Sequence, residues 1–138
     1  MLCEVNPQLH LTCVDPWSAY PVRSQEVQDR NYSVAVEALA GLNVSIKCLS
    51  SMEFVGVVLD GSLDFVFIDG DHSFENAMLD ILMWSKKVKS GGIVAVHDYH
   101  PFCGMDVILA VNAYTRANHI DPWYVTREME PTAFWVHA

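Results

Sequence analysis

Acidic and imidazole side chains follow directly after two apolar runs of the sequence. Asp69 comes after the run 64–68, and the pair His97 and Asp98 comes after the run 93–96. If the two runs are neighbouring strands, these three side chains meet at one edge of a sheet. Two carboxylates and an imidazole make a site for a divalent cation. Oxygen ligands suit magnesium or calcium, whereas the imidazole shifts the preference toward manganese, iron or zinc.

Asp71 stands two residues beyond Asp69. In that place a carboxylate can act as a base beside a bound metal. A structural alternative is that Asp71 or His72 caps the helix that follows, and one residue can serve both purposes. His100 is a further candidate ligand, although a histidine in a loop is more often solvated.

A third carboxylate, Asp15, ends the apolar run 10–14 and precedes Pro16. A carboxylate at a strand tip can accept hydrogen bonds from both hydroxyls of a ribose. An Asp-Pro pair is equally typical of a simple turn. Trp17 follows at once, and it is the one of the four tryptophans that we expect near a ligand. The others fit a hydrophobic core.

The elements that must position these residues alternate along the chain. Strands are predicted at 10–14, 44–49, 64–68 and 93–96, helices at 25–42, from 73 onward and at 107–117, a short helix or loop at 53–59, and a closing hairpin at 123–126 and 133–137. This alternation predicts an α/β fold with a doubly wound, mostly parallel sheet and helices on both faces. Ligands of such folds lie beyond the carboxyl ends of the strands, where the candidate residues stand.

The ends of two helices are predicted from local signals. The helix 25–42 is expected to be irregular near Asn31 and to end at Gly41. The helix that Ser73 opens is expected to run to a basic last turn with a glycine cap. The residues that form this end are Lys86, Lys87, Lys89 and Gly91.

Composition restricts the class of protein. The 138 residues are 51% hydrophobic and carry a net charge of -9, which fits a single domain, 1–138, with a proper core. The negative charge argues against nucleic acid and anionic membranes as partners. The four cysteines form no metal-binding pair, and no secretory signal or membrane-spanning run is visible. We therefore expect reduced thiols and a cytoplasmic protein.

The stretch Leu63–Tyr99 (LDFVFIDGDHSFENAMLDILMWSKKVKSGGIVAVHDY) resembles the fourth to fifth strands of class I S-adenosylmethionine (SAM) dependent methyltransferases. It is most similar to the sugar and small-molecule O-methyltransferase branch. Val14–Trp17 (VDPW) resembles the end of that branch's second strand, and 123–137 resembles its terminal hairpin. The resemblance covers nearly the whole chain and implies a Rossmann-like fold.

The resemblance also implies roles for single residues. Asp15, Trp17 and Asp69 would belong to the SAM site, with the pair Ser51 and Met52 flanking the adenine. The metal ligands would be Asp69 and Asp98, with His97 where some members carry another aspartate, and the metal magnesium or manganese. Asp71 would be the general base that takes a proton from the hydroxyl of a small-molecule acceptor.

One part of the family's pattern is missing. The first strand and the glycine-rich loop that wraps SAM have no counterpart, because residues 1–9 match at most a remnant of the helix after that loop. The sheet is then expected to lack a central strand and to expose paired edges. Three explanations are a fragment of a longer gene product, which we favour, a homo-oligomer that covers the gap, or a protein that has abandoned SAM. Methyl transfer by the truncated chain is expected to be impaired.

Two other functions compete with methyl transfer. The chain could be a non-catalytic binding or assembly module that keeps the methyltransferase fold, and binding of SAM or S-adenosylhomocysteine separates the two. It could also be a metal-dependent hydrolase built on the Asp/His cluster. The pair His97-Asp98 is similar to the pair of the HD phosphohydrolases, but those carry it on a helix, whereas here it ends an apolar strand.

Overall fold

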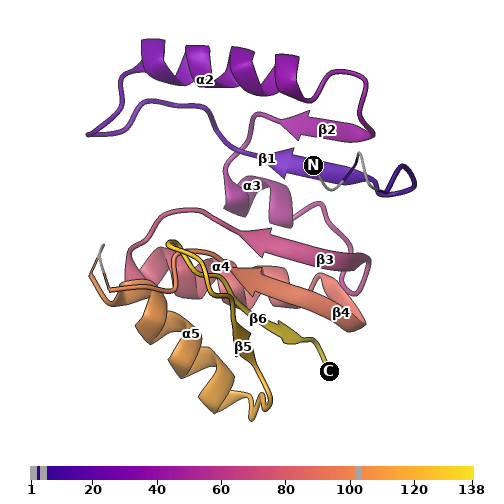
Figure 1. Ribbon diagram of the computed structural model, residues 1–138, viewed down its shortest axis with the longest axis vertical. Helices are drawn as coiled ribbons and strands as arrows, with labels where there is room; N and C mark the ends of the chain where they lie inside the picture. Colours follow the sequence, from indigo (N-terminus) through magenta and orange to yellow (C-terminus); the bar gives the residue numbers. More distant parts are fainter. Residues whose placement is uncertain (1–2, 4–5, 102–103) are drawn as a thin grey trace. The chain divides into compact units, whose positions relative to one another are not determined.

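The computed structural model describes residues 3, 6–101 and 104–138, and its elements follow the predicted order of strands and helices (Figure 1). The chain packs as two compact units, Met1–Phe54 and Val55–Ala138. Each unit contains one pair of parallel strands joined by a helix, which is the repeating unit of an α/β fold. The predicted Rossmann-like class is confirmed.

In the first unit, strand β1 (Leu11–Val14) pairs in parallel with β2 (Val44–Lys47). Helix α2 (Gln25–Ala38) connects the two strands, and the Ser24 side chain caps its first turn by accepting a hydrogen bond from the backbone of Val27. A parallel pair needs such a crossover, because its two strands run in the same direction.

Two details predicted for α2 were wrong. The helix is continuous through Asn31, whose amide donates to the side chain of Gln28 one turn earlier instead of breaking the backbone. The helix also ends at Ala38, with Leu39 as its C-cap. Gly41 lies beyond this end with φ of 79°, in the left-handed region that glycine adopts without strain.

The second unit contains a four-stranded sheet in the order β3-β4-β6-β5. Strand β3 (Leu63–Ile68) pairs in parallel with β4 (Val88–Val96). The closing hairpin of β5 (Tyr124–Val125) and β6 (Ala133–Val136) is antiparallel, as predicted, and β6 pairs with β4.

Helices α4 (Phe74–Ser85) and α5 (Asp106–Ala117) pack on each other, and α4 also packs on β3 and β4. The core of the unit contains the consecutive residues Val94–Val96 of β4 and the alternate residues Ala133 and Trp135 of β6, and Trp135 packs against Tyr114 of α5. The side chains of this unit with 0% exposure are Ile81, Val94, Ala110, Val111, Ala133 and Trp135. Burial of each large aliphatic side chain stabilises the fold by about 1.5–3 kcal/mol.

The predicted basic end of α4 was wrong, because the helix ends at Ser85, Lys86 and Lys87 form a turn, and β4 begins at Val88. Lys87 lies with its Nζ 2.6 Å from Oδ1 of Asp60, and Lys89 pairs with Asp64. Gly91 belongs to β4, where its N–H donates to the carbonyl of His137. Lys87 and Lys89 therefore pair with carboxylates before and within β3, whereas Lys86 is the C-cap residue of α4.

The parallel strands lie in two separate sheets. In the described part of the chain, the only strand that pairs with β1 is β2, and the only strand that pairs with β3 is β4. Each of these two strands therefore has one unpaired edge in the described part of the chain. None of the described helices is long and apolar enough to cross a membrane.

Candidate functional site

The strands β3 and β4 bring their carboxyl ends together, as their parallel pairing requires. Ile68 is the register partner of Val96, and the N–H of His97 donates to the carbonyl of Ile68 at 2.9 Å. The residues that follow, Asp69 on one strand and Asp98 near the end of the other, therefore lie at the same edge of the sheet. The expected meeting of Asp69, His97 and Asp98 is present.

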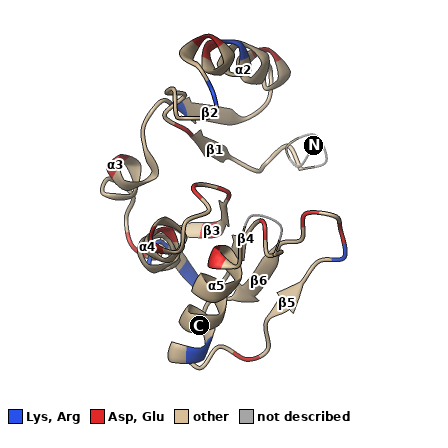
Figure 2. Cartoon of the chain, turned by 90° about the vertical axis from the view of Figure 1, so that its left-hand side faces the viewer, with Lys and Arg blue, Asp and Glu red and all other residues tan. Residues whose placement is uncertain are grey.

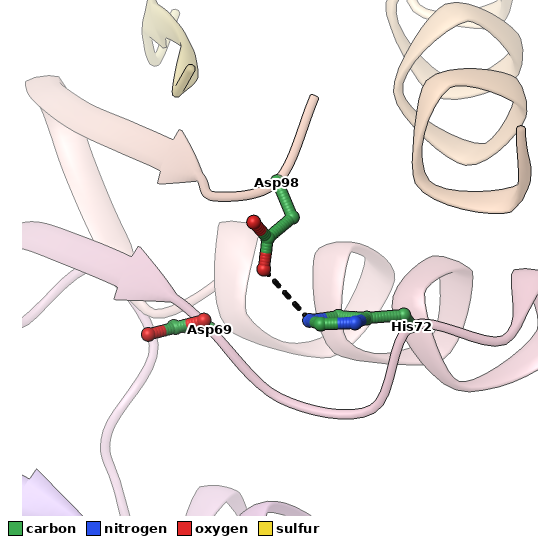
Figure 3. Close-up of side chains that lie close together, drawn as sticks. All are labelled: Asp69, His72 and Asp98. Carbon is green, nitrogen blue, oxygen red and sulfur yellow. Dashed lines mark ion pairs between the residues drawn. The ribbon is translucent and has the colours of Figure 1, made fainter. Parts of the chain in front are cut away.

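Asp98 is the centre of this edge and is contacted by three histidines. Its Oδ2 lies 2.8 Å from Nε2 of His72 and 3.3 Å from Nδ1 of His97, and its Oδ1 lies 3.1 Å from Nε2 of His100. The Nδ1 atom of His97 also lies 3.4 Å from Oδ1 of Asp69. Figure 3 shows the contact between His72, in the loop before α4, and Asp98, with Asp69 beside them at the end of β3.

The environment of Asp98 keeps its carboxylate ionised. Its side chain is only 12% exposed, and its φ of 56° is a left-handed conformation that few residues other than glycine adopt. Burial by itself raises the pKa of Asp98, but the charges of His97 and His72 and the hydrogen bond from His100 outweigh burial and lower the pKa. A buried, ionised carboxylate is suited to hold a cation.

The donor atoms fit a divalent cation. One ligand atom from each of Asp69, His72 and Asp98 lies within 4.8 Å of the others, and so does one from each of His97, Asp98 and Glu130. The Nδ1 atom of His97 is buried and has no hydrogen-bond partner of normal geometry in the described part of the chain. This set combines carboxylates with imidazoles, as manganese, iron and zinc sites do.

Two of these donors were missed from the sequence. His72 was read only as a possible helix cap, although it stands one residue after Asp71 at a strand end. Glu130 lies far along the chain, in the loop between β5 and β6. This loop comes close to the end of β4 because β6 is the neighbour of β4 in the sheet. The backbone N–H of Tyr99 donates to the carbonyl of Pro131 and ties that loop to the site.

His100 differs from its prediction. It is 8% exposed, so the expectation of a solvated loop histidine was wrong. The contact with Asp98 explains its burial, because the carboxylate supplies a partner for the imidazole. His100 therefore supports Asp98 from the side opposite to His72, since the two histidines contact different oxygens of the carboxylate.

Asp71 forms the turn that leads into α4. Its Oδ1 accepts hydrogen bonds from both the backbone N–H and the hydroxyl of Ser73, the N-cap residue of α4. The side-chain bond from Ser73, followed by the backbone bond and a bond from Asn76, lowers the pKa of Asp71. Asp71 therefore orders the turn before α4, whereas the N-cap position belongs to Ser73, so the predicted cap at Asp71 or His72 was wrong.

In the first unit, Asp15 and Trp17 lie in the loop between β1 and α2. Oδ1 of Asp15 accepts a hydrogen bond of 2.6 Å from the N–H of Trp17, the turn expected of an Asp-Pro pair. The indole of Trp17 packs edge-on against Tyr32 of α2, with ring centroids 5.4 Å apart. The two residues are therefore neighbours in one ordered loop.

Ser51 and Met52 begin helix α3 (Ser51–Val55). The residue before them, Ser50, exchanges hydrogen bonds with Glu53: the carboxylate accepts from the N–H and hydroxyl of Ser50, and the N–H of Glu53 donates back to that hydroxyl. This is a capping box, and it lowers the pKa of Glu53. It fixes the backbone at Ser51 and Met52.

Comparison with known proteins agrees with this architecture. A family model described as a methyltransferase domain matches residues 1–99. The O-methyltransferase NovP superposes with a TM-score of 0.66 at 16% identity, over 98% of this chain and 62% of its own. A protein from Corynebacterium glutamicum gives 0.63 at 17% identity, over 96% and 62%. Cofactor-bound Rv0187 from MTB gives 0.61 at 17% identity, over 96% and 63%.

No curated protein matches the chain at the same level of significance. The chain spans about three fifths of the length of these solved structures, which share its fold. The family model covers well over half of the chain, including the loop at Asp15 and both strand ends that form the Asp98 cluster. By fold and by family, therefore, the chain belongs to the methyltransferase domains and is similar to class I SAM-dependent O-methyltransferases.

Proposed function

We propose that the protein transfers a methyl group from SAM to a hydroxyl of a small molecule, with a divalent cation at Asp69, His72, His97 and Asp98. The family supports methyl transfer in general. The cluster around Asp98 is the observation that carries the finer proposal, since it combines buried charge, converging donor atoms and the edge where α/β folds bind ligands.

The nucleoside part of SAM is assigned to the first unit. Asp15 would accept hydrogen bonds from the ribose hydroxyls, and Trp17 would stand beside the same loop. Ser51 and Met52 would contact the adenine from the first turn of α3. The support for this assignment is that hydrogen bonds hold both backbone segments, so they need little reordering when a ligand binds.

The acceptor is assigned to the second unit, where Asp71 would take the proton of its hydroxyl. The oxygen then forms a bond to the methyl carbon while the bond from carbon to sulfur breaks and S-adenosylhomocysteine leaves. Because hydrogen bonds from Ser73 lower the pKa of Asp71, this carboxylate is a weak base. A bound divalent cation supplies the complementary chemistry, since it lowers the pKa of a nearby hydroxyl.

Two features of the whole chain bear on its partners. The sequence has 17 acidic and 8 basic residues, which favours a small-molecule acceptor over nucleic acid or an anionic membrane. Figure 2 shows where the charged residues lie along the described part of the chain. We also propose a homo-oligomer, supported by the unpaired edges of β1 and β3 in the described residues.

The described thiols of Cys3, Cys13 and Cys48 are free, which supports the cytoplasm as the compartment.

Binding is tested by thermal unfolding with S-adenosylhomocysteine, with and without manganese or magnesium. A ligand at a hundredfold over its Kd stabilises by about 2.7 kcal/mol, which raises Tm by roughly 5–10 °C for a domain of this size. Asp98→Asn should abolish the metal response, whereas Asp106→Asn, at the half-buried start of α5, should keep it. An unchanged metal response of Asp98→Asn would overturn the metal site.

Catalysis is tested by incubating the chain with SAM, manganese and a panel of hydroxylated small molecules, and measuring S-adenosylhomocysteine. For any acceptor that turns over, Asp71→Asn should lower kcat by about 10²–10⁴, the usual effect of losing a general base. Binding of S-adenosylhomocysteine without any turnover would instead favour a non-catalytic module of the same fold. Turnover of phosphate esters with manganese would favour the hydrolase.

A further inference from the structure

We propose that Gln25 and Gln28 of α2 are positioning residues for the nucleoside: they hold the loop after β1 in the shape in which Asp15 can bind a ribose. The inference rests on the proposed function, because it concerns the same SAM site. Neither glutamine lies in a sequence motif, and their role follows from the hydrogen bonds that connect α2 to the loop.

Gln25, the first residue of α2, binds the loop through both ends of its side-chain amide. Its Oε1 accepts from the N–H of Ala19 at 3.1 Å, and its Nε2 donates to the carbonyl of Trp17 at 2.9 Å. The same Nε2 donates to Oδ1 of Asp29 at 2.7 Å, one turn along the helix. Asp29 thereby fixes the rotamer of Gln25, so the amide is oriented before any ligand arrives.

Gln28 holds the residue between these two contacts. Its Nε2 donates to the carbonyl of Ser18 at 3.0 Å, and the residue is 7% exposed. A buried glutamine is costly unless its amide is hydrogen-bonded, so the contact with Ser18 offsets the cost of burying Gln28. Residues three apart lie on the same face of a helix, which places Gln25 and Gln28 side by side over the loop.

The loop needs this support because its backbone is strained at Trp17. The φ of Trp17 is 50°, a conformation that is uncommon for a bulky residue and persists only where the surroundings enforce it. The N–H of the same residue donates to the carboxylate of Asp15. The conformation of Trp17 therefore sets the orientation of the Asp15 carboxylate, and Gln25 and Gln28 hold the carbonyls of Trp17 and Ser18.

The sequence offers a matched control, because the chain has three glutamines and the third, Gln8, is exposed and uses only its backbone in the described contacts. The test compares Gln25→Leu, Gln28→Leu and Gln8→Leu in the full chain. Gln25 is exposed, so its substitution tests the loop even if the buried Gln28→Leu variant folds poorly.

The first measurement is amide hydrogen exchange without ligand. In Gln25→Leu and Gln28→Leu, the amides of Trp17 and Ala19 should exchange faster, while the amide of Leu11 in β1 keeps its protection. Gln8→Leu should leave all three unchanged. Unchanged exchange at Trp17 and Ala19 in both loop variants would overturn the inference, because the glutamines would then not order the loop.

The second measurement is the Kd for S-adenosylhomocysteine by calorimetry. Loss of one hydrogen bond corresponds to a rise in Kd of about fivefold to tenfold, which we expect for Gln28→Leu and at least that for Gln25→Leu. In an Asp15→Ala background the same substitutions should change Kd by less than about twofold, because the carboxylate that they position is gone.

The outcomes separate this inference from the proposed function. If the unsubstituted chain binds no S-adenosylhomocysteine, the proposed function fails, and the nucleoside role of the glutamines fails with it. If the unsubstituted chain binds and the glutamine variants bind equally well, only the positioning role is overturned. An effect that is undiminished in the Asp15→Ala background also overturns it, since that result would indicate general destabilisation.

Discussion

The Nε2 atom of His72 lies 2.8 Å from Oδ2 of Asp98, although the two residues follow different strands (Figure 3). His72 belongs to the loop between β3 and α4, and Asp98 belongs to the loop after β4. This contact joins the two loops across the edge of the sheet. The contact also adds a second imidazole to the proposed metal ligands. Without His72, His97 would be the only nitrogen donor among them.

The first prediction concerns the preference among metals. His72→Gln removes a nitrogen donor and should weaken manganese binding by about tenfold to hundredfold, the range seen when support of a metal site is lost. Magnesium binding should change much less, because magnesium prefers oxygen ligands. Both affinities can be measured by titrating Tm against each metal.

His119→Gln is the control for this substitution. His119 is exposed and lies just after the C-terminal end of α5, whereas Asp106 is the first residue of that helix. It should bind both metals as the unsubstituted chain does. Equal weakening of manganese and magnesium by His72→Gln would show that His72 acts only on the charge of Asp98 and is not a ligand.

The fold was predictable because the apolar runs are continuous and the helical spacing is regular. The run 64–68 forms β3 as predicted, although only Ile68 of it is buried and Phe67 is 47% exposed, and the adjacent parallel strands bring Asp69 and Asp98 to one edge. The pairing of these two residues therefore followed from topology alone. The sheet was expected to lack a central strand and to expose edges, and within the described residues β1 and β3 each have one unpaired edge.

The errors arose where long-range contacts override local signals. Lys87 and Lys89 have the charge of a helix end, but the partners that hold them, Asp60 and Asp64, precede or open β3. Glu130 could not be assigned to the site from the sequence, because its place depends on the pairing of β6 with β4. The local pattern predicted the hairpin of β5 and β6 but not that β6 would pair with β4.

The second prediction separates two adjacent glycines of β4. A Cβ at Gly92 would lie 2.6 Å from Cγ1 of Val88 and 2.8 Å from the carbonyl oxygen of Asp64 in β3, so backbone must move. Gly92→Ala should therefore cost at least about 1–3 kcal/mol of unfolding free energy, as overpacking does. Urea denaturation gives the value.

Gly91 is the comparison for this glycine. A Cβ there would meet nothing within 4 Å, but its φ of 81° is left-handed. Gly91→Ala should cost about 1–2 kcal/mol through the backbone alone, and Gly91→Asn should cost less, because asparagine tolerates this conformation. If Gly91→Asn proves as harmful as Gly92→Ala, the steric distinction between the two sites is wrong.

The third prediction concerns pH and the pair of Lys87 and Asp60. The hydrogen bond from Lys87, together with its charge, lowers the pKa of Asp60 in the folded state. A lowered folded pKa means that the pair stabilises the fold above the pKa of the unfolded chain. This stabilisation is lost as the pH falls through the folded pKa, so the window lies below about pH 4.

Asp60→Asn should accordingly lower Tm slightly and by the same amount at pH 7 and pH 5. The difference from the unsubstituted chain should shrink as the pH falls below about 4. Glu37→Gln, an exposed change on α2, serves as the control for the loss of one negative charge. A difference that grows on acidification would contradict the assigned direction of the shift.

The fourth prediction uses two neighbouring residues of α4 that face opposite ways. Ile81 is 0% exposed and belongs to the core of the second unit, whereas Leu82 is 43% exposed. Ile81→Ala should lower the unfolding free energy by about 2–5 kcal/mol, because it removes buried methyl groups and leaves a cavity. Leu82→Ala should change it by less than about 1 kcal/mol, since most of that side chain's loss is at the surface. Both values come from urea denaturation at pH 7. If Leu82→Ala costs as much as Ile81→Ala, the outer face of α4 is covered in solution, and analytical ultracentrifugation of the two variants would then show whether self-association covers it.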